Sequence, residues 1–176
     1  MSPANDNTTE SSKTQKTSPR ERAVWRSLEG VLDPEIPVIN VIDLGIIAAV
    51  RADDEGVEVD MTPTFAGCPA LDVIRKGIAE AVKAIGEDRV TVNVVYDPPW
   101  TSDRITPDGR RKLKEFGLAP PGKRCTGGEL PNLESTLCPY CDSTNTEMES
   151  IFGPTLCRSI HYCHACKQSF EHFKAV

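Results

Sequence analysis

The spacing of apolar residues predicts a strand, a loop and a helix in the middle of the chain. Apolar and polar residues alternate over residues 57–61, which is typical of a half-buried strand. Further on, apolar positions recur every three or four residues, as on one face of a helix: Leu71, Ile74, Ile78, Val82 and Ile85. Gly86 stands where a glycine commonly ends a helix, so we expect the helix to stop there.

A second helix is predicted nearer the N-terminus. Ser18, Pro19 and Glu21 have the spacing of a capping box with proline at the first helical position. The helix must end near Asp33, because Pro34 disfavours the helical conformation for the residue before it. Residues 1–17 are polar with almost nothing apolar, and we expect a disordered tail there.

Two further apolar runs complete the predicted sheet. Residues 41–50 and 89–95 are apolar enough for strands, and the turn residues 53–56 predict a hairpin between the strands of 41–50 and 57–61. The order is then helix, strand, strand, helix, strand. We therefore predict an α+β domain over residues 18–118, in which helices cover a small three-stranded sheet.

The region after this domain has a different composition. Thr106 and Pro107 can start a short helix that closes at Gly117, and residues 119–134, rich in proline and glycine, are typical of a linker. Cys125 lies in this linker without a cysteine at metal-binding spacing, and we interpret it as incidental.

Residues 135–176 contain the most specific pattern in the chain. Two Cys-x₂-Cys pairs, Cys138 with Cys141 and Cys163 with Cys166, have the spacing of a four-thiolate zinc site. Short strands at residues 146–152, 159–162 and 169–173 would complete a zinc ribbon of the rubredoxin-like type. So small a module needs the metal to fold, with a contribution on the order of 10 kcal/mol. An iron–sulfur cluster, a redox pair or a metal-free module are the alternatives.

Other cysteine and histidine residues of this module are not needed as ligands. Four cysteines complete a tetrahedral shell, so His161, His164 and His172 are interpreted as strand or surface residues. Cys157 is either a spare cysteine or a surface thiol near the metal site.

Cys68 is the candidate reactive thiol of the first domain. Pro69 suits the first helical position, which would place Cys68 at or next to the N-cap, among unpaired backbone N–H groups. A thiol there is biased toward the thiolate, the form that binds metals or attacks electrophiles. The alternative is that Cys68 is a small buried apolar residue, as single cysteines often are.

Three acidic residues are candidates for the same site. Asp33 and Glu35 lie in a stiff proline-containing loop, and Asp43 interrupts an apolar run, where a carboxylate needs a partner. Loops at one edge of the sheet could bring all three near Cys68. Solvated charges for Asp33 and Glu35, and backbone capping for Asp43, are the structural alternatives.

Composition narrows the classes of function. The chain has 176 residues, a formal net charge of −6 and seven cysteines. The acidic balance and the lack of a basic run argue against nucleic-acid binding. The chain has no apolar stretch of about 20 residues for a membrane span and no signal-peptide core, so we expect a cytoplasmic protein whose cysteines are reduced.

Several of these segments together resemble one known family. Residues 33–37, 43–46, 62–69 and 98–100 are similar, in this order, to the iron–sulfur cluster assembly family once labelled domain of unknown function fifty-nine. The resemblance implies an accessory role in maturation, without catalysis. It places the functional cysteine of the family at Cys68 and its acidic motif at Asp33 and Glu35, with Asp43 at the strand entrance.

The ribbon after this domain narrows the resemblance to one branch of the family, which accompanies phenylacetyl-CoA epoxidase in aerobic phenylacetate catabolism. The implied partners are its reductase, which carries an iron–sulfur cluster, and its di-iron oxygenase. A transient cluster bound by Cys68 could be shared by a homodimer, with small thiols as remaining ligands. Two alternatives stay open: a scaffold component of the epoxidase complex, and a thiol enzyme using Cys68, although the first domain has no histidine to serve as its base.

Overall fold

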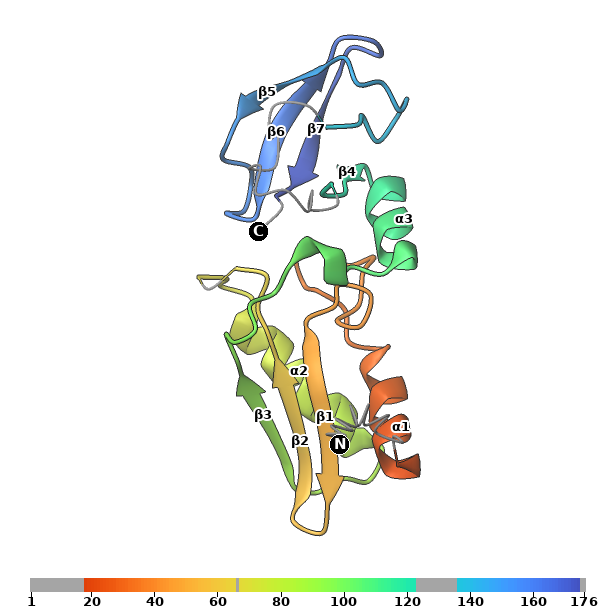
Figure 1. Cartoon of the computed structure of the whole chain (residues 1–176), viewed down its shortest axis with the longest axis vertical. Helices are drawn as coiled ribbons and strands as arrows, with labels where there is room; N and C mark the ends of the chain where they lie inside the picture. Colours follow the sequence, from red (N-terminus) through yellow and green to blue (C-terminus); the bar gives the residue numbers. More distant parts are fainter. Residues whose placement is uncertain (1–17, 66, 123–135, 175–176) are drawn as a thin grey trace, which may run out of the picture.

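The computed structural model describes residues 18–65, 67–122 and 136–174, which form two sheets (Figure 1). The first sheet has the order β1-β2-β3 and is made of β1 (Ile47–Asp53), β2 (Gly56–Met61) and β3 (Val90–Val94). β1 and β2 are antiparallel, whereas β2 and β3 are parallel and are connected by α2 (Leu71–Ala84). The predicted α+β fold is confirmed.

The two predicted helices of this domain form, each with its predicted signals. α1 (Pro19–Leu28) begins with the capping box: Ser18 Oγ accepts from the Glu21 N–H at 3.1 Å, and the Glu21 carboxylate accepts from the Ser18 N–H at 2.7 Å. Gly86 follows α2 with φ of +95°, the left-handed conformation that a C-terminal glycine adopts readily. Within the described ranges, no helix has the length and hydropathy needed to span a bilayer.

Two predicted boundaries in this domain are wrong. α1 ends at Leu28 rather than near Asp33, because the chain turns at Glu29 and Gly30, and glycine is a poor helix former. β1 starts only at Ile47, since residues 41–45 form turns instead of strand. Apolar residues of this turning segment still enter the core, where Val41 and Leu44 are buried.

The second sheet belongs to the C-terminal module. Its order is β4-β7-β6-β5, with β4 (Leu118–Ala119), β5 (Thr146–Ser150), β6 (Arg158–Cys163) and β7 (Gln168–Phe173). The three predicted ribbon strands are therefore confirmed. β4 follows η1 (Ser102–Arg104) and α3 (Pro107–Glu115), so Ala119, the first residue of the predicted linker, already pairs with the ribbon. Residues 123–135 of that linker, with Cys125, lie outside the described residues.

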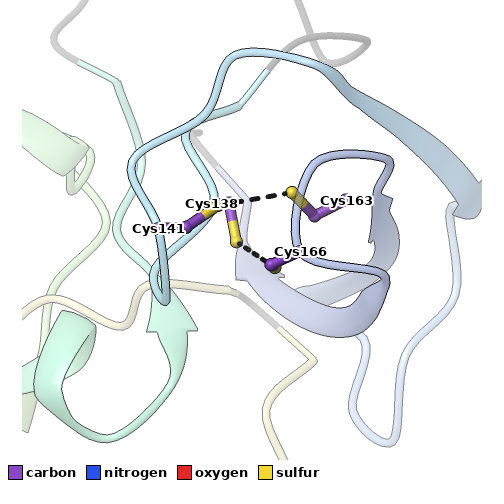
Figure 2. Close-up of side chains that lie close together, drawn as sticks. All are labelled: Cys138, Cys141, Cys163 and Cys166. Atoms are coloured by element: carbon purple, nitrogen blue, oxygen red, sulfur yellow. Dashed lines mark hydrogen bonds between the residues drawn. The ribbon is translucent and has the colours of Figure 1, made fainter.

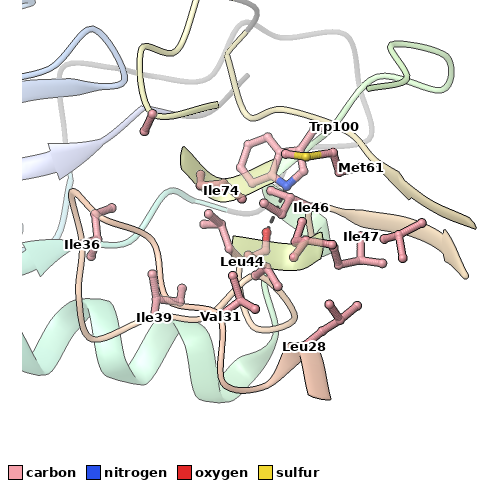
Figure 3. Close-up of a cluster of buried hydrophobic side chains, with 14 of the residues drawn as sticks. Leu28, Val31, Ile36, Ile39, Leu44, Ile46, Ile47, Met61, Ile74 and Trp100 are labelled. Atoms are coloured by element: carbon pink, nitrogen blue, oxygen red, sulfur yellow. Dashed lines mark hydrogen bonds between the residues drawn. The ribbon is translucent and has the colours of Figure 1, made fainter. Parts of the chain in front are cut away.

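The ribbon packs against the loop end of the first domain. Phe173 of β7 joins the core of that domain and meets the Trp100 ring edge-on, with 6.1 Å between the ring centroids. Figure 3 shows Trp100 beside Met61, with its indole N–H donating to the Leu44 carbonyl at 3.0 Å. Leu44 and Met61 also line a pocket beside Cys68.

Candidate functional sites: a four-cysteine centre and the Cys68 thiol

The four cysteines of the ribbon converge on one point. Their sulfur atoms all lie within 4.8 Å of one another, with 3.6 Å between Cys138 and Cys166 and 3.6 Å between Cys141 and Cys163 (Figure 2). Each pair is carried by a tight turn whose next residue, Asp142 or Lys167, has a positive φ of 58° or 62°. The two turns therefore present their sulfurs in the same way.

This geometry fits a tetrahedral metal ion. Zinc–thiolate bonds of about 2.3 Å place the sulfurs of a regular tetrahedron about 3.8 Å apart, close to the separations seen here. Backbone N–H groups of Cys166 and Ala165, aimed at the Cys163 sulfur, lower the pKa of that thiol to about 6. The residues thus offer a closed four-sulfur shell, and the centre is a structural metal site.

Cys68 lies in the loop between β2 and α2, but not at the helix N-cap. α2 begins at Leu71 with Ala70 as N-cap, so Pro69 precedes the helix and Cys68 stands two residues before the cap. Its carbonyl accepts from the Leu71 N–H at 3.3 Å, and its own N–H donates to the Phe65 carbonyl at 3.1 Å. Cys68 is therefore one residue further from the helix than the predicted position at or next to the N-cap.

The predicted bias of Cys68 toward thiolate is also wrong. Burial raises the pKa of this thiol, and the negative charges of Glu35 and Asp33 raise it further, against a lowering by the Ala70 N–H bonded to the sulfur. A single backbone donor does not outweigh burial and two carboxylates. Cys68 is therefore a protonated thiol at neutral pH when nothing is bound to it.

Two small pockets meet at the Cys68 side chain. The first is mostly apolar, with Asp33 as its charged member and Met61, Leu71 and Ile74 among its walls. The second is bordered by Glu35 on one side and by Cys157 of the ribbon on the other. The structure thus places Asp33, Glu35 and Cys68 around one loop cluster, as the sequence suggested.

Comparison with known proteins matches each of the two parts of the chain to a family model. Residues 21–94 match the family model described as iron–sulfur cluster assembly protein, and residues 123–174 match the PaaD zinc beta ribbon domain. An Escherichia coli protein named as a candidate component of 1,2-phenylacetyl-CoA epoxidase is 37% identical over 158 residues, covering 90% of this chain and 94% of that protein. The chain belongs to the iron–sulfur cluster assembly protein family and carries the PaaD-type ribbon.

Other members of the family match the first domain alone. The Fe-S protein maturation auxiliary factor SufT of Staphylococcus aureus is 42% identical over 78 residues, covering 43% of this chain and 88% of SufT. A solved structure of a domain of unknown function 59 from Bacillus anthracis has a TM-score of 0.50 and 29% identity, covering 53% of this chain and 91% of that one. The ribbon is thus an addition to the part shared with these relatives.

In this chain, Asp43 does not line either of the two pockets at Cys68. Its carboxylate accepts from Lys112 Nζ at 2.5 Å and from Thr106 Oγ1 at 2.9 Å. The predicted need for a partner is met by these two residues at α3. Asp33 instead uses its Oδ1 to accept from the N–H groups of Glu35 and Ile36, at 2.8 and 2.9 Å, which fixes the acidic loop.

Cys157 is a site residue that reasoning from the sequence did not select. It is half-buried, lies between β5 and β6, packs against the core of the first domain and lines the second pocket at Cys68. It has no cysteine at metal-binding spacing and is remote from Cys68 in the sequence. Only the packing of the ribbon on the first domain brings the two thiols to one pocket.

Proposed function

We propose that this chain is a non-catalytic accessory protein that assists the assembly of an iron–sulfur cluster or iron centre, with Cys68 as the residue that holds the cargo. The proposal is carried by one observation: Cys68 and two carboxylates, Asp33 and Glu35, line two pockets at the loop end of the first domain. Relatives of this domain are named Fe-S protein maturation auxiliary factors, which supports the same role.

The electrostatics of the site suit a carrier that must release its cargo. The thiol holds its proton until a cation approaches, because burial and the nearby carboxylates oppose the free thiolate. The same carboxylates attract an iron ion, and formation of the iron–sulfur bond displaces the proton. With so few protein ligands, the cargo is held less firmly than a metal in a closed four-thiolate shell.

The four-cysteine centre has a different role in this proposal. Four thiolates at tetrahedral spacing suit zinc, and the family description of the ribbon agrees with that metal. We infer that zinc holds the ribbon folded and that the ribbon docks the protein on its client. Metal analysis of the purified chain should give one zinc per chain and no iron at this centre.

We place this function in the cytoplasm, in maturation of a phenylacetyl-CoA epoxidase system. The name of the Escherichia coli relative supports this assignment. The client would be the reductase with its iron–sulfur cluster or the di-iron oxygenase. A thiol enzyme is less well supported, because no histidine is among the described residues that line the two pockets, and the Cys68 thiol is protonated.

The test compares the iron and sulfide content of the epoxidase reductase, purified anaerobically from cells. One strain carries the intact protein, one Cys68→Ala, one lacks the protein, and one carries Cys125→Ala as a matched cysteine control. We expect the content to fall equally in the Cys68→Ala strain and in the strain without the protein, and to stay full in the control.

Full content in every strain would overturn the proposal for this client. The same strains then serve to measure iron in the di-iron oxygenase. If that is also unchanged, while the chain copurifies with the epoxidase in fixed stoichiometry, the protein is a scaffold component of the complex.

A further inference from the structure

The segment between β5 and β6 brings a second thiol to the Cys68 pocket. Cys157 from the ribbon and Cys68 from the first domain both line this pocket, together with Glu35 and Phe65. It comprises about 200 Å³ of space, including the part open to solvent. Both thiols are half-buried and neither is in a disulfide. A negative charge on Cys157 would raise the pKa of the Cys68 thiol.

Several contacts hold Cys157 in this place. The next residue, Arg158, is buried, and its guanidinium donates to the Glu35 carbonyl at 2.7 Å and to the Glu171 carboxylate at 2.7 Å. The Cys157 carbonyl accepts from the Lys174 N–H at 2.9 Å, and its sulfur lies 3.1 Å from Thr155 Oγ1. The ribbon is thus attached to the loop that carries Glu35, with Cys157 beside the attachment.

We propose that Cys68 and Cys157 together form a two-thiolate binding site for the iron–sulfur cargo, shared between the two parts of one chain. This inference rests on the proposed function and makes it more specific. Thiolates are the usual protein ligands of iron–sulfur clusters, and two from one chain leave the remaining positions for small thiols or for the client. As each sulfur–iron bond forms, the S–H proton passes to the small thiolate or water that leaves the iron, and no oxidation state changes.

A site of this kind explains why the thiol pair lies where the two parts meet. A cluster bound to both cysteines would fasten the ribbon to the first domain, and its release would free both thiols again. Binding of cargo is therefore coupled to the position of the ribbon, the part that distinguishes this chain from the shorter auxiliary factors. Relatives that have only the first domain cannot build the site in this way.

The proximity of the thiols is tested first, independently of iron. The zinc-loaded protein in a Cys125→Ser background is treated anaerobically with dibromobimane, which becomes fluorescent only after both arms have reacted with thiols. We expect intramolecular crosslinking between Cys68 and Cys157, identified by peptide mass spectrometry. The crosslink should be absent in Cys68→Ser and in Cys157→Ser. The pairing would be overturned if crosslinks from Cys68 to the four metal-site cysteines formed in the same yield as the crosslink from Cys68 to Cys157.

The ligand role is tested by anaerobic reconstitution with ferrous iron, sulfide and glutathione in the same background. We expect cluster content to fall by about tenfold or more in both Cys157→Ser and Cys157→Ala, a loss typical of metal sites deprived of a supporting group. Zinc content and circular dichroism should not change, which excludes unfolding as the cause.

The outcomes separate this inference from the proposed function. If both Cys157 variants bind as much cluster as the parent while Cys68→Ser does not, the two-thiolate site is wrong and Cys68 is the only ligand of the chain. If the parent binds no cluster although the reductase still requires Cys68 in cells, the inference is overturned and the maturation role stands.

Discussion

The two sulfur sites of this protein differ in the number of cysteines they contain and in the parts of the chain that supply them. The four-cysteine centre gathers its ligands within one small sheet, on two turns of the same kind, with all sulfurs within 4.8 Å of one another. The Cys68 pocket is bordered by one thiol from each part of the chain and by an acidic loop. The first arrangement is complete by itself, whereas the second needs the two parts to be packed together.

The pKa values of the thiols at the two sites also differ. Within the four-cysteine centre the pKa values are split: backbone N–H groups lower the pKa of Cys163 to about 6, whereas burial and the neighbouring thiols raise the pKa of Cys166 to about 12. At Cys68, burial and the carboxylates of Glu35 and Asp33 raise the pKa. Backbone donors and a bound metal favour the thiolate, whereas burial and nearby carboxylates favour the protonated thiol. The comparison teaches that the groups surrounding a sulfur, and not the cysteine alone, decide how readily the thiol gives up its proton.

The largest expected effect comes from removing the metal of the ribbon. Chelation, or Cys163→Ala, should remove a contribution on the order of 10 kcal/mol and unfold the ribbon, because its small sheet buries too little apolar surface. Amide hydrogen exchange should show loss of protection in β5, β6 and β7, with β1–β3 and α2 still protected. Cys68→Ala is the matched control and should keep the metal of the ribbon. Persistent protection of β6 without metal would contradict the assignment of the site as structural.

A smaller effect is expected at Arg158, which joins the two regions. Its side chain is only 9% exposed, donates a hydrogen bond to the Glu35 carbonyl and forms an ion pair with the Glu171 carboxylate. Arg158→Ala should lower the free energy of unfolding by about 2–3 kcal/mol, since it removes charge-assisted bonds from a buried place. It should also reduce crosslinking between Cys68 and Cys157.

Urea unfolding followed by fluorescence of the tryptophans measures this change. Arg111→Ala is the matched control, because Arg111 forms its ion pairs with Asp108 and Glu115 on the exposed face of α3. Equal stability of the two variants would mean that the two regions are held together by apolar contacts such as Phe173 with Trp100, and not by the arginine.

The features predicted correctly from the sequence are those encoded by neighbouring residues. The capping box at Ser18, the apolar stripe of α2 and the two Cys-x₂-Cys pairs each depend on spacings of three or four residues, which local structure turns directly into geometry. Hydrophobic spacing also identified β2 and β3. These signals were sufficient for the fold class and for the metal site.

The features that the sequence could not predict depend on contacts between distant segments. The apolar run at residues 41–50 is only partly strand, because the chain turns at Gly45, where φ is +70° and a Cβ would collide with the Arg104 carbonyl oxygen. The Lys112 partner of Asp43 and the Cys157 neighbour of Cys68 are remote in sequence. Packing decides these pairs, and no local pattern reports them.

The smallest expected effect concerns the charge beside Cys68. Glu35→Gln removes one of the negative charges that raise the pKa of the Cys68 thiol, so the pKa should fall. At neutral pH, below the pKa, a lower pKa means more thiolate, and alkylation of Cys68 by iodoacetamide should become about two- to fivefold faster, as expected for a partly screened charge. Peptide mass spectrometry over a range of pH values gives the rate at this residue alone.

Glu115→Gln, whose carboxylate is not among the charges acting on Cys68, should leave the pH profile unchanged. If the profile of Glu35→Gln also stays where it is, the Glu35 charge does not contribute to keeping the thiol protonated, and Glu35 acts on the incoming cation instead of on the cysteine.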